Sequence, residues 1–171
     1  MSDENIILVG FMGTGKSAIG KRLASLLHKK FYDADKEIER VTGMSLMNLY
    51  NKYGIVRFQS EEELMLRKLV KEKNAIIATG GSLVIDEERL ELLMDSGVVI
   101  CLTADPKVIM ERVQRRNNRP LLRKDNMYQD ILALIKERED VHNKAHLVVD
   151  TSHKSFEEII QAITTFLDNR V

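Results

Sequence analysis

The chain has 171 residues, of which 44% are hydrophobic and 30% charged, a composition that excludes a disordered or fibrous protein. Its basic and acidic residues balance at a net charge of zero, so we expect neither nucleic acid nor an anionic membrane as a partner. The only cysteine, Cys101, excludes an internal disulfide, and with an acidic start that lacks signal-peptide character it favours a cytoplasmic location. The length suits one domain over residues 1–171, which we expect to be a monomer.

The first predicted element is a buried strand over residues 6–9, which runs into a glycine-rich loop and then a helix over residues 17–27. The loop, GFMGTGKS at residues 10–17, matches the phosphate-loop pattern G-x-x-x-x-G-K-[ST] in the strand–loop–helix context that the pattern requires. This context disfavours the alternative, an accidental glycine-rich turn. Glycines let successive backbone N–H groups point at one anion, and the helix start adds unpaired donors. We therefore assign the phosphates of a nucleotide to Gly13, Thr14, Gly15, Lys16, Ser17 and Ala18.

The next predicted strand covers residues 31–35 and ends in two carboxylates, Asp33 and Asp35. Residues two apart in a strand share a face, so both side chains are expected to project into the cleft beside the phosphate loop. There one carboxylate would hold the water shell of a Mg²⁺ ion that Ser17 Oγ ligates, while Lys16 would reach the β- and γ-phosphates. The other carboxylate would take the proton from a hydroxyl acceptor. The alternative is that Asp33 and Asp35 are simply two solvated carboxylates at the end of a strand, which the phosphate loop beside them disfavours.

The remaining elements alternate between helices and strands. Helices are predicted over residues 36–42, 45–53 and 56–73, with glycines 43 and 54 as breaks, and then over 86–96, from 105, over 127–144 and over 155–168. The last three strands are predicted over residues 75–78, 98–102 and 146–150. Five strands alternating with helices predict a three-layer α/β/α domain with a five-stranded parallel sheet.

Two further features fall at the carboxyl ends of the strands. Gly80 and Gly81 follow a strand, which indicates a close approach of the backbone by a ligand or by another segment of the chain. The basic segment 113–125 contains Pro120 and lacks the apolar spacing of a helix. We interpret it as a lid that brings Arg119 over the triphosphate, where its charge would stabilise the transferred phosphoryl group. A solvated basic loop is the alternative.

Five short motifs together resemble those of the shikimate kinase family. They are GFMGTGKS, FYDAD, ATGG, RPLL and VDT, in the family's order and spacing between Ile6 and Thr151. The resemblance implies a P-loop NTPase fold of the nucleoside-monophosphate-kinase type, with acceptor-binding helices over about 36–73 and the lid over about 113–125. It implies a small cytoplasmic kinase that uses ATP and Mg²⁺ to phosphorylate the 3-hydroxyl of shikimate, on the route to chorismate and the aromatic amino acids.

The resemblance also implies roles for single residues. The catalytic residues would be Lys16, Asp35 and Arg119. Asp35 would be the general base, Asp33 would contact the metal through water beside Ser17, and Arg112 would lie against the adenine, with Arg119 also on the nucleotide. Shikimate would be bound by Asp35, Gln59, Gly80, Gly81 and Arg138, the last of which would grip its carboxylate.

The chain departs from the family pattern at several positions, and these cluster on the acceptor side. Gln59 stands where the family has an arginine that pairs with the carboxylate of shikimate, and a glutamine loses that charge-assisted, bidentate contact. Arg57 is no obvious replacement for that arginine. It lies two positions before Gln59, and on a helix residues two positions apart point about 200° away from each other. Ser82 replaces the third glycine of a triplet, and in the motif Arg-x-Pro-x-Tyr that begins at Arg138, Asp140 replaces the proline and His142 the tyrosine.

Three alternatives follow. The first is a related P-loop kinase of another small hydroxy acid or polyol, for which the acceptor-side departures speak. The second is a non-catalytic nucleotide-binding homologue, which the intact residues on the nucleotide side disfavour. The third, a GTP switch, is disfavoured because the guanine-reading pattern Asn-Lys-x-Asp is absent from the sequence.

Overall fold

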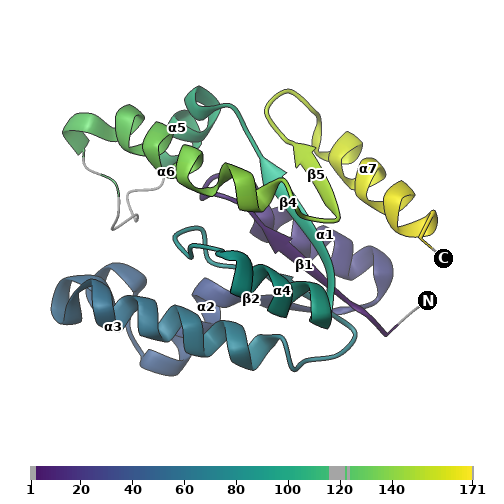
Figure 1. Cartoon of the computed structure of the whole chain (residues 1–171), viewed down its shortest axis with the longest axis horizontal. Helices are drawn as coiled ribbons and strands as arrows, with labels where there is room; N and C mark the ends of the chain where they lie inside the picture. The colour runs from purple at the N-terminus through teal and green to yellow at the C-terminus, as the bar shows by residue number, and fades with distance from the viewer. Residues whose placement is uncertain (1–2, 116–121, 123, 171) are drawn as a thin grey trace.

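The computed structural model describes residues 3–115, 122 and 124–170 (Figure 1). The strands are β1 (Asn5–Val9), β2 (Lys30–Asp33), β3 (Ala75–Ala78), β4 (Gly97–Thr103) and β5 (Leu147–Asp150). The helices are α1 (Lys16–Leu27), α2 (Ala34–Thr42), α3 (Leu46–Leu69), α4 (Glu87–Ser96), α5 (Pro106–Gln114), the 3-10 helix η1 (Lys124–Asn126), α6 (Met127–His142) and α7 (Phe156–Asp168). Within these residues, no helix combines the length and the apolar character that crossing a bilayer requires.

The strands of the described chain form one sheet in the order β2-β3-β1-β4-β5, and every neighbouring pair is parallel. The predicted five-stranded parallel sheet is confirmed. Within the sheet, β2 and β3 lie between β1 and one edge, and β4 and β5 lie between β1 and the opposite edge. In sheets of this kind ligands bind outside the carboxyl ends of the strands where the order reverses, which here is the end of β1.

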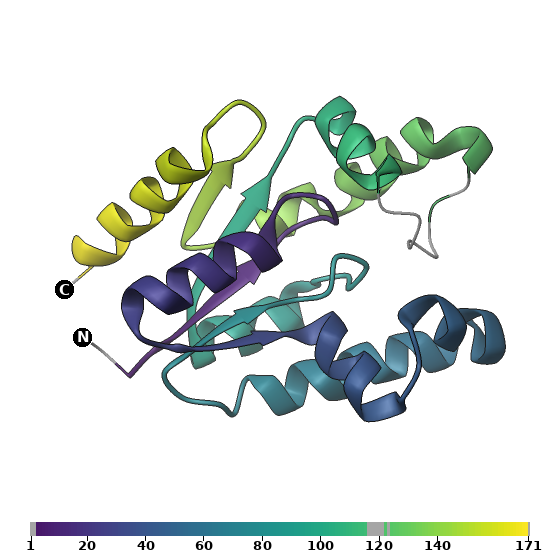
Figure 2. The same ribbon diagram turned by 180° about the vertical axis from the view of Figure 1, so that it is seen from behind.

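Alternate residues of β1 enter two different cores. Ile7 and Val9 pack in a cluster with side chains of α3 and α4, whereas Ile6 and Leu8 pack in a cluster with side chains of α1 and α7. Successive side chains of a strand point to opposite faces, so helices must cover both faces of such an apolar strand. Figures 1 and 2 show the resulting three layers, with α4 in front of the sheet in one view and α1 in front in the other.

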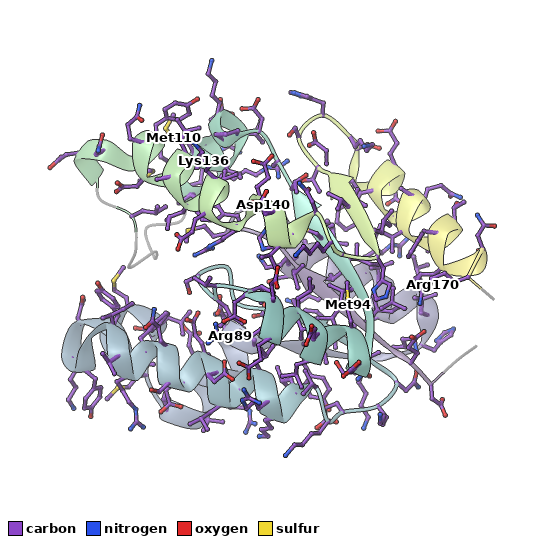
Figure 3. The ribbon with its side chains drawn as sticks, in the orientation of Figure 1. Arg89, Met94, Met110, Lys136, Asp140 and Arg170 are labelled. Atoms are coloured by element: carbon purple, nitrogen blue, oxygen red, sulfur yellow. The ribbon has the colours of Figure 1, made fainter. Side chains whose placement is uncertain are left out.

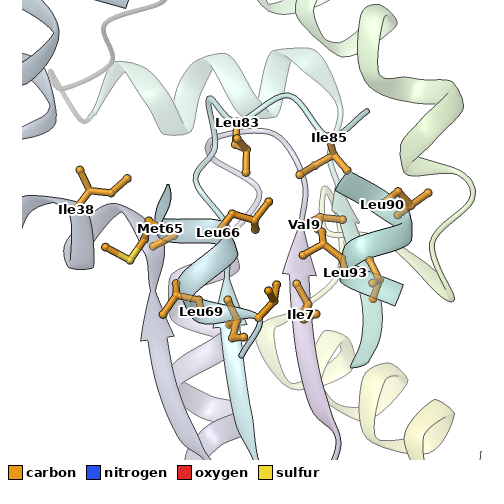
Figure 4. Packing of buried hydrophobic residues seen from close by; sticks show 14 of the residues in the cluster. Ile7, Val9, Ile38, Met65, Leu66, Leu69, Leu83, Ile85, Leu90 and Leu93 are labelled. Atoms are coloured by element: carbon orange, nitrogen blue, oxygen red, sulfur yellow. The ribbon is translucent and has the colours of Figure 1, made fainter. Parts of the chain in front are cut away.

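Apolar side chains anchor the loop that follows β3. Leu83 and Ile85 are buried in the cluster that also contains Val9 and Leu66 (Figure 4). Interior side chains are close-packed, so this anchoring fixes the backbone just before them. Residues 79–82, which carry the predicted glycine pair, are thereby held beside the phosphate loop and α3.

The prediction of a strand over residues 31–35 is wrong at its end. β2 stops at Asp33, whose carboxylate Oδ1 accepts hydrogen bonds from the backbone N–H groups of Asp35 (3.1 Å) and Lys36 (3.4 Å). Asp33 is therefore the N-cap of α2, because its side chain satisfies donors that the first helical turn leaves free. Asp35 lies in that first turn, not on a strand.

Two helices differ from the prediction in extent. α3 contains the predicted break at Gly54 (φ 78°, ψ −178°) and ends at Leu69, four residues before the predicted end. α5 continues to Gln114 because Ile109 and Val113 are buried on one face, so Arg112 lies on a helix and the predicted lid loses its first residues. The rest of that lid falls largely on residues 116–121 and 123, outside the described chain.

Candidate active site

The phosphate loop curls tightly at the start of α1. Gly13 and Gly15 have φ angles of 77° and 97°, in the left-handed region that favours glycine, and Gly15 is the N-cap of the helix. Lys16 Nζ donates to the carbonyl oxygens of Gly10 (2.7 Å) and Phe11 (3.0 Å). A loop of this curvature at a helix N-terminus aims backbone N–H groups at a shared anion.

A cavity of about 420 Å³ opens beside this loop, a size typical of a small-molecule site. The predicted site residues that line it are Gly13, Thr14, Gly15, Lys16, Ser17, Ala18, Asp33, Asp35, Gly81 and Arg112. The predicted residues that are not among its lining are Gln59, Gly80 and Arg138. Arg119 lies outside the part of the chain that the structure describes. The cavity therefore joins the nucleotide side to both aspartates but not to the whole acceptor side.

A hydroxyl and a carboxylate meet in the cavity wall. Ser17 Oγ, on α1, donates to Asp33 Oδ2 over 2.5 Å. The capping bonds to Asp33 Oδ1 orient this carboxylate, so its second oxygen faces the loop. Among the described residues, no group of three or more His, Cys, Asp or Glu side chains is placed to hold a metal. The pair fits Mg²⁺, which takes oxygen ligands, keeps several waters and needs few ligands from the protein.

Arg112 connects α5 to the phosphate loop and to the end of β5. Its Nη1 donates to Gly13 O (3.1 Å) and Thr151 Oγ1 (3.1 Å), and its Nη2 donates to Thr151 O (2.9 Å). Thr151 Oγ1 also lies 3.1 Å from Thr14 O. Thr151 is not among the predicted site residues, although its place directly after a predicted strand, where ligands bind in parallel sheets, was a signal for one. Lys154 and Phe156, which follow it, also line the cavity.

The close approach predicted at the glycine pair comes from other segments of the chain. A Cβ built on Gly81 would lie 2.8 Å from Met12 Cα in the phosphate loop. A Cβ built on Gly80 would lie 2.8 Å from Asp35 Oδ1 and 3.2 Å from Glu62 Oε1. Two carboxylates, one from α2 and one from α3, therefore converge on the backbone of Gly80.

Arg138 lies behind the glycine pair and is only 2% exposed. Its Nη1 donates to Gly81 O (3.0 Å), its Nη2 donates to Ser82 O (3.2 Å), and its guanidinium stacks 5.3 Å from the ring centre of Phe11. Its buried Nε has no hydrogen-bond partner among the described residues. Arg138 thus braces the loop after β3 against the phosphate loop and keeps one donor unused.

Glu62 is a residue of this region that sequence analysis did not assign. It is 5% exposed on α3, and Ser82 Oγ donates to its Oε1 over 2.6 Å. Burial raises the pKa of Glu62 to about 7, opposed by the Ser82 hydrogen bond and supported by the charge of Asp35. A signal did exist, because Glu62 is one helical turn beyond the buried Phe58. Gln59 is exposed on the same helix.

Glu62 and His142 give opposite pH dependences of stability. Glu62 has its pKa raised from 4.5 to about 7, so the folded state keeps a proton that the unfolded state has lost, and stability falls as pH rises through this window. Burial, with the charges of Arg138 and Lys16, lowers the pKa of His142 from 6.5 to about 4. The unfolded state then binds the extra proton, and stability falls as pH drops through that window. Where the two windows overlap, between about pH 4.5 and pH 6.5, the two effects on stability partly cancel.

Replacing Glu62 by glutamine is expected to remove the contribution of Glu62 to the pH dependence of stability and to leave that of His142. The variant should match the parent protein at about pH 4 and exceed its free energy of unfolding by about 3 kcal/mol at about pH 8, since the amide carries no ionisation penalty. Urea unfolding at both pH values measures this difference. Equal differences at the two pH values would show that Glu62 ionises normally.

Comparisons with known proteins agree with this geometry. A sequence model of the family described as shikimate kinase matches residues 12–168. The shikimate kinase of Pelotomaculum thermopropionicum is 47% identical over 164 residues, covering 96% of this chain and 95% of that protein. That of Desulforudis audaxviator is 45% identical, covering 98% of this chain and 88% of that protein.

Solved structures give the same result. The shikimate kinase of Acinetobacter baumannii in complex with shikimate superposes with a TM-score of 0.92 at 34% identity, over 98% of this chain and 94% of that one. The shikimate kinase of Aquifex aeolicus superposes with a TM-score of 0.84 at 32% identity, over 97% of each chain. A deoxyadenosine kinase from M. mycoides, 18% identical with a TM-score of 0.65 over 98% of this chain and 100% of that one, shares the fold. These similarities extend over nearly the whole chain.

Proposed function

The chain belongs to the shikimate kinase family, and from this membership we propose that it transfers the γ-phosphate of ATP to the 3-hydroxyl of shikimate. The observation that carries the proposal is a single cavity lined by the phosphate-loop residues Lys16 and Ser17 and by the carboxylate of Asp35. A phosphate donor and a hydroxyl acceptor held there would meet between the loop and α2. Catalysis would then come from positioning and charge neutralisation.

The nucleotide side would bind the triphosphate of ATP through the loop N–H groups and Lys16. To do so, Lys16 Nζ would exchange its contacts with two loop carbonyls for phosphate oxygens. Mg²⁺ at Ser17 and Asp33 would neutralise charge on the phosphates. Arg112 would present its guanidinium to the base from the cavity wall, and Arg119 of the segment 113–125 would complete the charge around the transferred group.

The acceptor would lie against α2, α3 and the loop after β3, within the helical region 36–73. Asp35 would accept the proton of the attacking hydroxyl, since it lines the same cavity as the phosphate loop. Gly80 and Gly81 would allow close contact with the acceptor, and the spare Nε donor of Arg138 would serve its carboxylate. Such an enzyme would work as a cytoplasmic monomer.

The exposed Gln59 favours one other function, phosphorylation of a different hydroxy acid or polyol. A neutral side chain at this position attracts a carboxylate less than an arginine does. The fold and the nucleotide side would be the same in both cases. Only the acceptor distinguishes the two functions.

An ADP-release assay coupled to NADH oxidation tests the proposal. With ATP and Mg²⁺, shikimate is expected to give ADP release far above the rate with quinate, gluconate, glycerol or no acceptor. Release with one of the other acceptors and not with shikimate would identify the related kinase. ATP binding by calorimetry without ADP release on any acceptor would identify a non-catalytic homologue.

A further inference from the structure

We propose that Ser82 is a positioning residue whose hydroxyl holds the buried carboxylate of Glu62 in the acceptor site. The proposal rests on the proposed function, because that function makes the region around Asp35 and Gly80 the acceptor site. It concerns a side chain that departs from the family pattern, since Ser82 stands where a glycine would offer no hydroxyl.

The contact joins two elements that are distant in sequence. Ser82 lies in the loop after β3 and Glu62 on α3, 20 positions earlier, yet their Oγ and Oε1 atoms are 2.6 Å apart. Apolar side chains surround this part of α3, among them Phe58 and Leu66, each 1% exposed. A carboxylate buried among such neighbours needs a donor, and a hydrogen bond to a charged group contributes more than one between neutral groups.

The cations nearest to Glu62 are engaged elsewhere. Arg138 of α6 donates to the carbonyls of Gly81 and Ser82. Arg89 of α4, labelled in Figure 3 between α3 and α4, donates to Glu63 Oε2 (2.7 Å) and to the carbonyl of Val84 (3.0 Å). Both arginines lower the pKa of Glu62 only through space, and Asp35 of α2 raises it. Within the described chain, Ser82 is the hydrogen-bond donor that Glu62 has, and no ion pair replaces it.

The position of Glu62 matters for the acceptor because the carboxylates of Glu62 and Asp35 both lie close to the backbone of Gly80. Both carboxylates approach the same backbone position, at 2.8 Å and 3.2 Å from a Cβ built there. Without the Ser82 hydroxyl, Glu62 would either take up a proton or turn away from Gly80. Either change alters the charge and the shape of the surface against which a hydroxylated acceptor would lie, and leaves the phosphate loop untouched.

The first measurement follows Glu62 in the ligand-free protein. NMR titration of the glutamate carboxyl carbons, with the Glu62 signal assigned from Glu62→Gln, is expected to show a midpoint raised by about one pH unit in Ser82→Ala. Ser82→Thr, which keeps a hydroxyl, should return the midpoint to that of the parent. Ser60→Ala is the matched control, because it removes an exposed hydroxyl from α3 whose one hydrogen bond within the described residues is to Val56 O. An unchanged midpoint in Ser82→Ala would overturn the proposal.

The second measurement follows the acceptor. Ser82→Ala is expected to lower kcat/KM for shikimate about tenfold with the KM for ATP unchanged. In a Gln59→Arg background the loss should shrink to about twofold, because residues three apart on a helix are neighbours and the arginine can pair with Glu62. Equal losses in the two backgrounds would overturn the proposal. Ser82→Gly is the second variant, should the alanine form fail to fold.

The two measurements separate this proposal from the proposed function. The titration needs no substrate, so a shifted midpoint in a protein that does not phosphorylate shikimate would refute the function and leave the Ser82–Glu62 contact standing. Normal shikimate turnover with an unshifted midpoint in Ser82→Ala would refute the positioning role of Ser82 and leave the proposed function standing.

Discussion

Replacing Lys16 by alanine is expected to lower ADP release with shikimate roughly a thousandfold. Lys16 is 7% exposed, and its ammonium lies inside the curl of the phosphate loop, where charge would build up on a transferred phosphoryl group. A preorganised charge in a site that excludes water stabilises a transition state far more than a solvated one does. The coupled ADP-release assay at saturating ATP and Mg²⁺ measures the loss.

Lys21→Ala is the control for this variant, because Lys21 is an exposed lysine on the same helix. It should keep the parent rate, which separates loss of the phosphate contact from damage to α1. Circular dichroism should show both variants folded. A Lys16→Ala rate within tenfold of the parent would refute the mechanism.

Replacing Asp35 by asparagine is expected to lower kcat by roughly a hundredfold to ten-thousandfold, with little change in ATP affinity. The amide keeps the size of the side chain and its place in the first turn of α2, but it cannot accept the proton of the attacking hydroxyl. The loss should therefore appear in turnover and not in nucleotide binding. Steady-state kinetics combined with calorimetric ATP titration measure the two quantities.

Glu37→Gln serves as the control for Asp35→Asn. Glu37 lies in the same turn of α2, and its carboxylate pairs with Arg40 over 2.8 Å, away from the cavity. The neutral side chain should leave kcat within about twofold of the parent value. The ion pair that is lost has an exposed arginine partner, and such pairs contribute little. If Asp35→Asn keeps the parent turnover, another group takes the proton.

The parts of the fold that depend on local sequence were predictable. The apolar run of β1, the glycine loop and the helix that follows are adjacent in the chain, and their order alone predicts the phosphate loop. The break at Gly54 and the capping box of Ser155 and Glu158 at α7 are local patterns of the same kind. The resemblance to shikimate kinases is confirmed by the family match over residues 12–168.

The parts that depend on contacts between distant segments were not predictable. The end of β2 was misplaced because the capping role of Asp33 competes with strand propensity, a choice that hydrophobic periodicity does not record. The contact of Ser82 with Glu62 and that of Arg112 with Thr151 join positions 20 and 39 apart, and single-sequence patterns do not pair such positions. Whether the glycine pair faces a ligand or a neighbouring segment was open for the same reason.

The resting contacts of Lys16 set a threshold for its ligands. Its ammonium already has two carbonyl partners at 2.7 Å and 3.0 Å, so any anion must compete with oxygens that the protein itself supplies. A polyphosphate brings several negative oxygens along the loop at once and can win this competition, whereas sulfate or inorganic phosphate offers a single tetrahedral group. The protein should therefore bind the polyphosphate of a nucleotide more tightly than sulfate or inorganic phosphate, each of which engages fewer of the loop's donors.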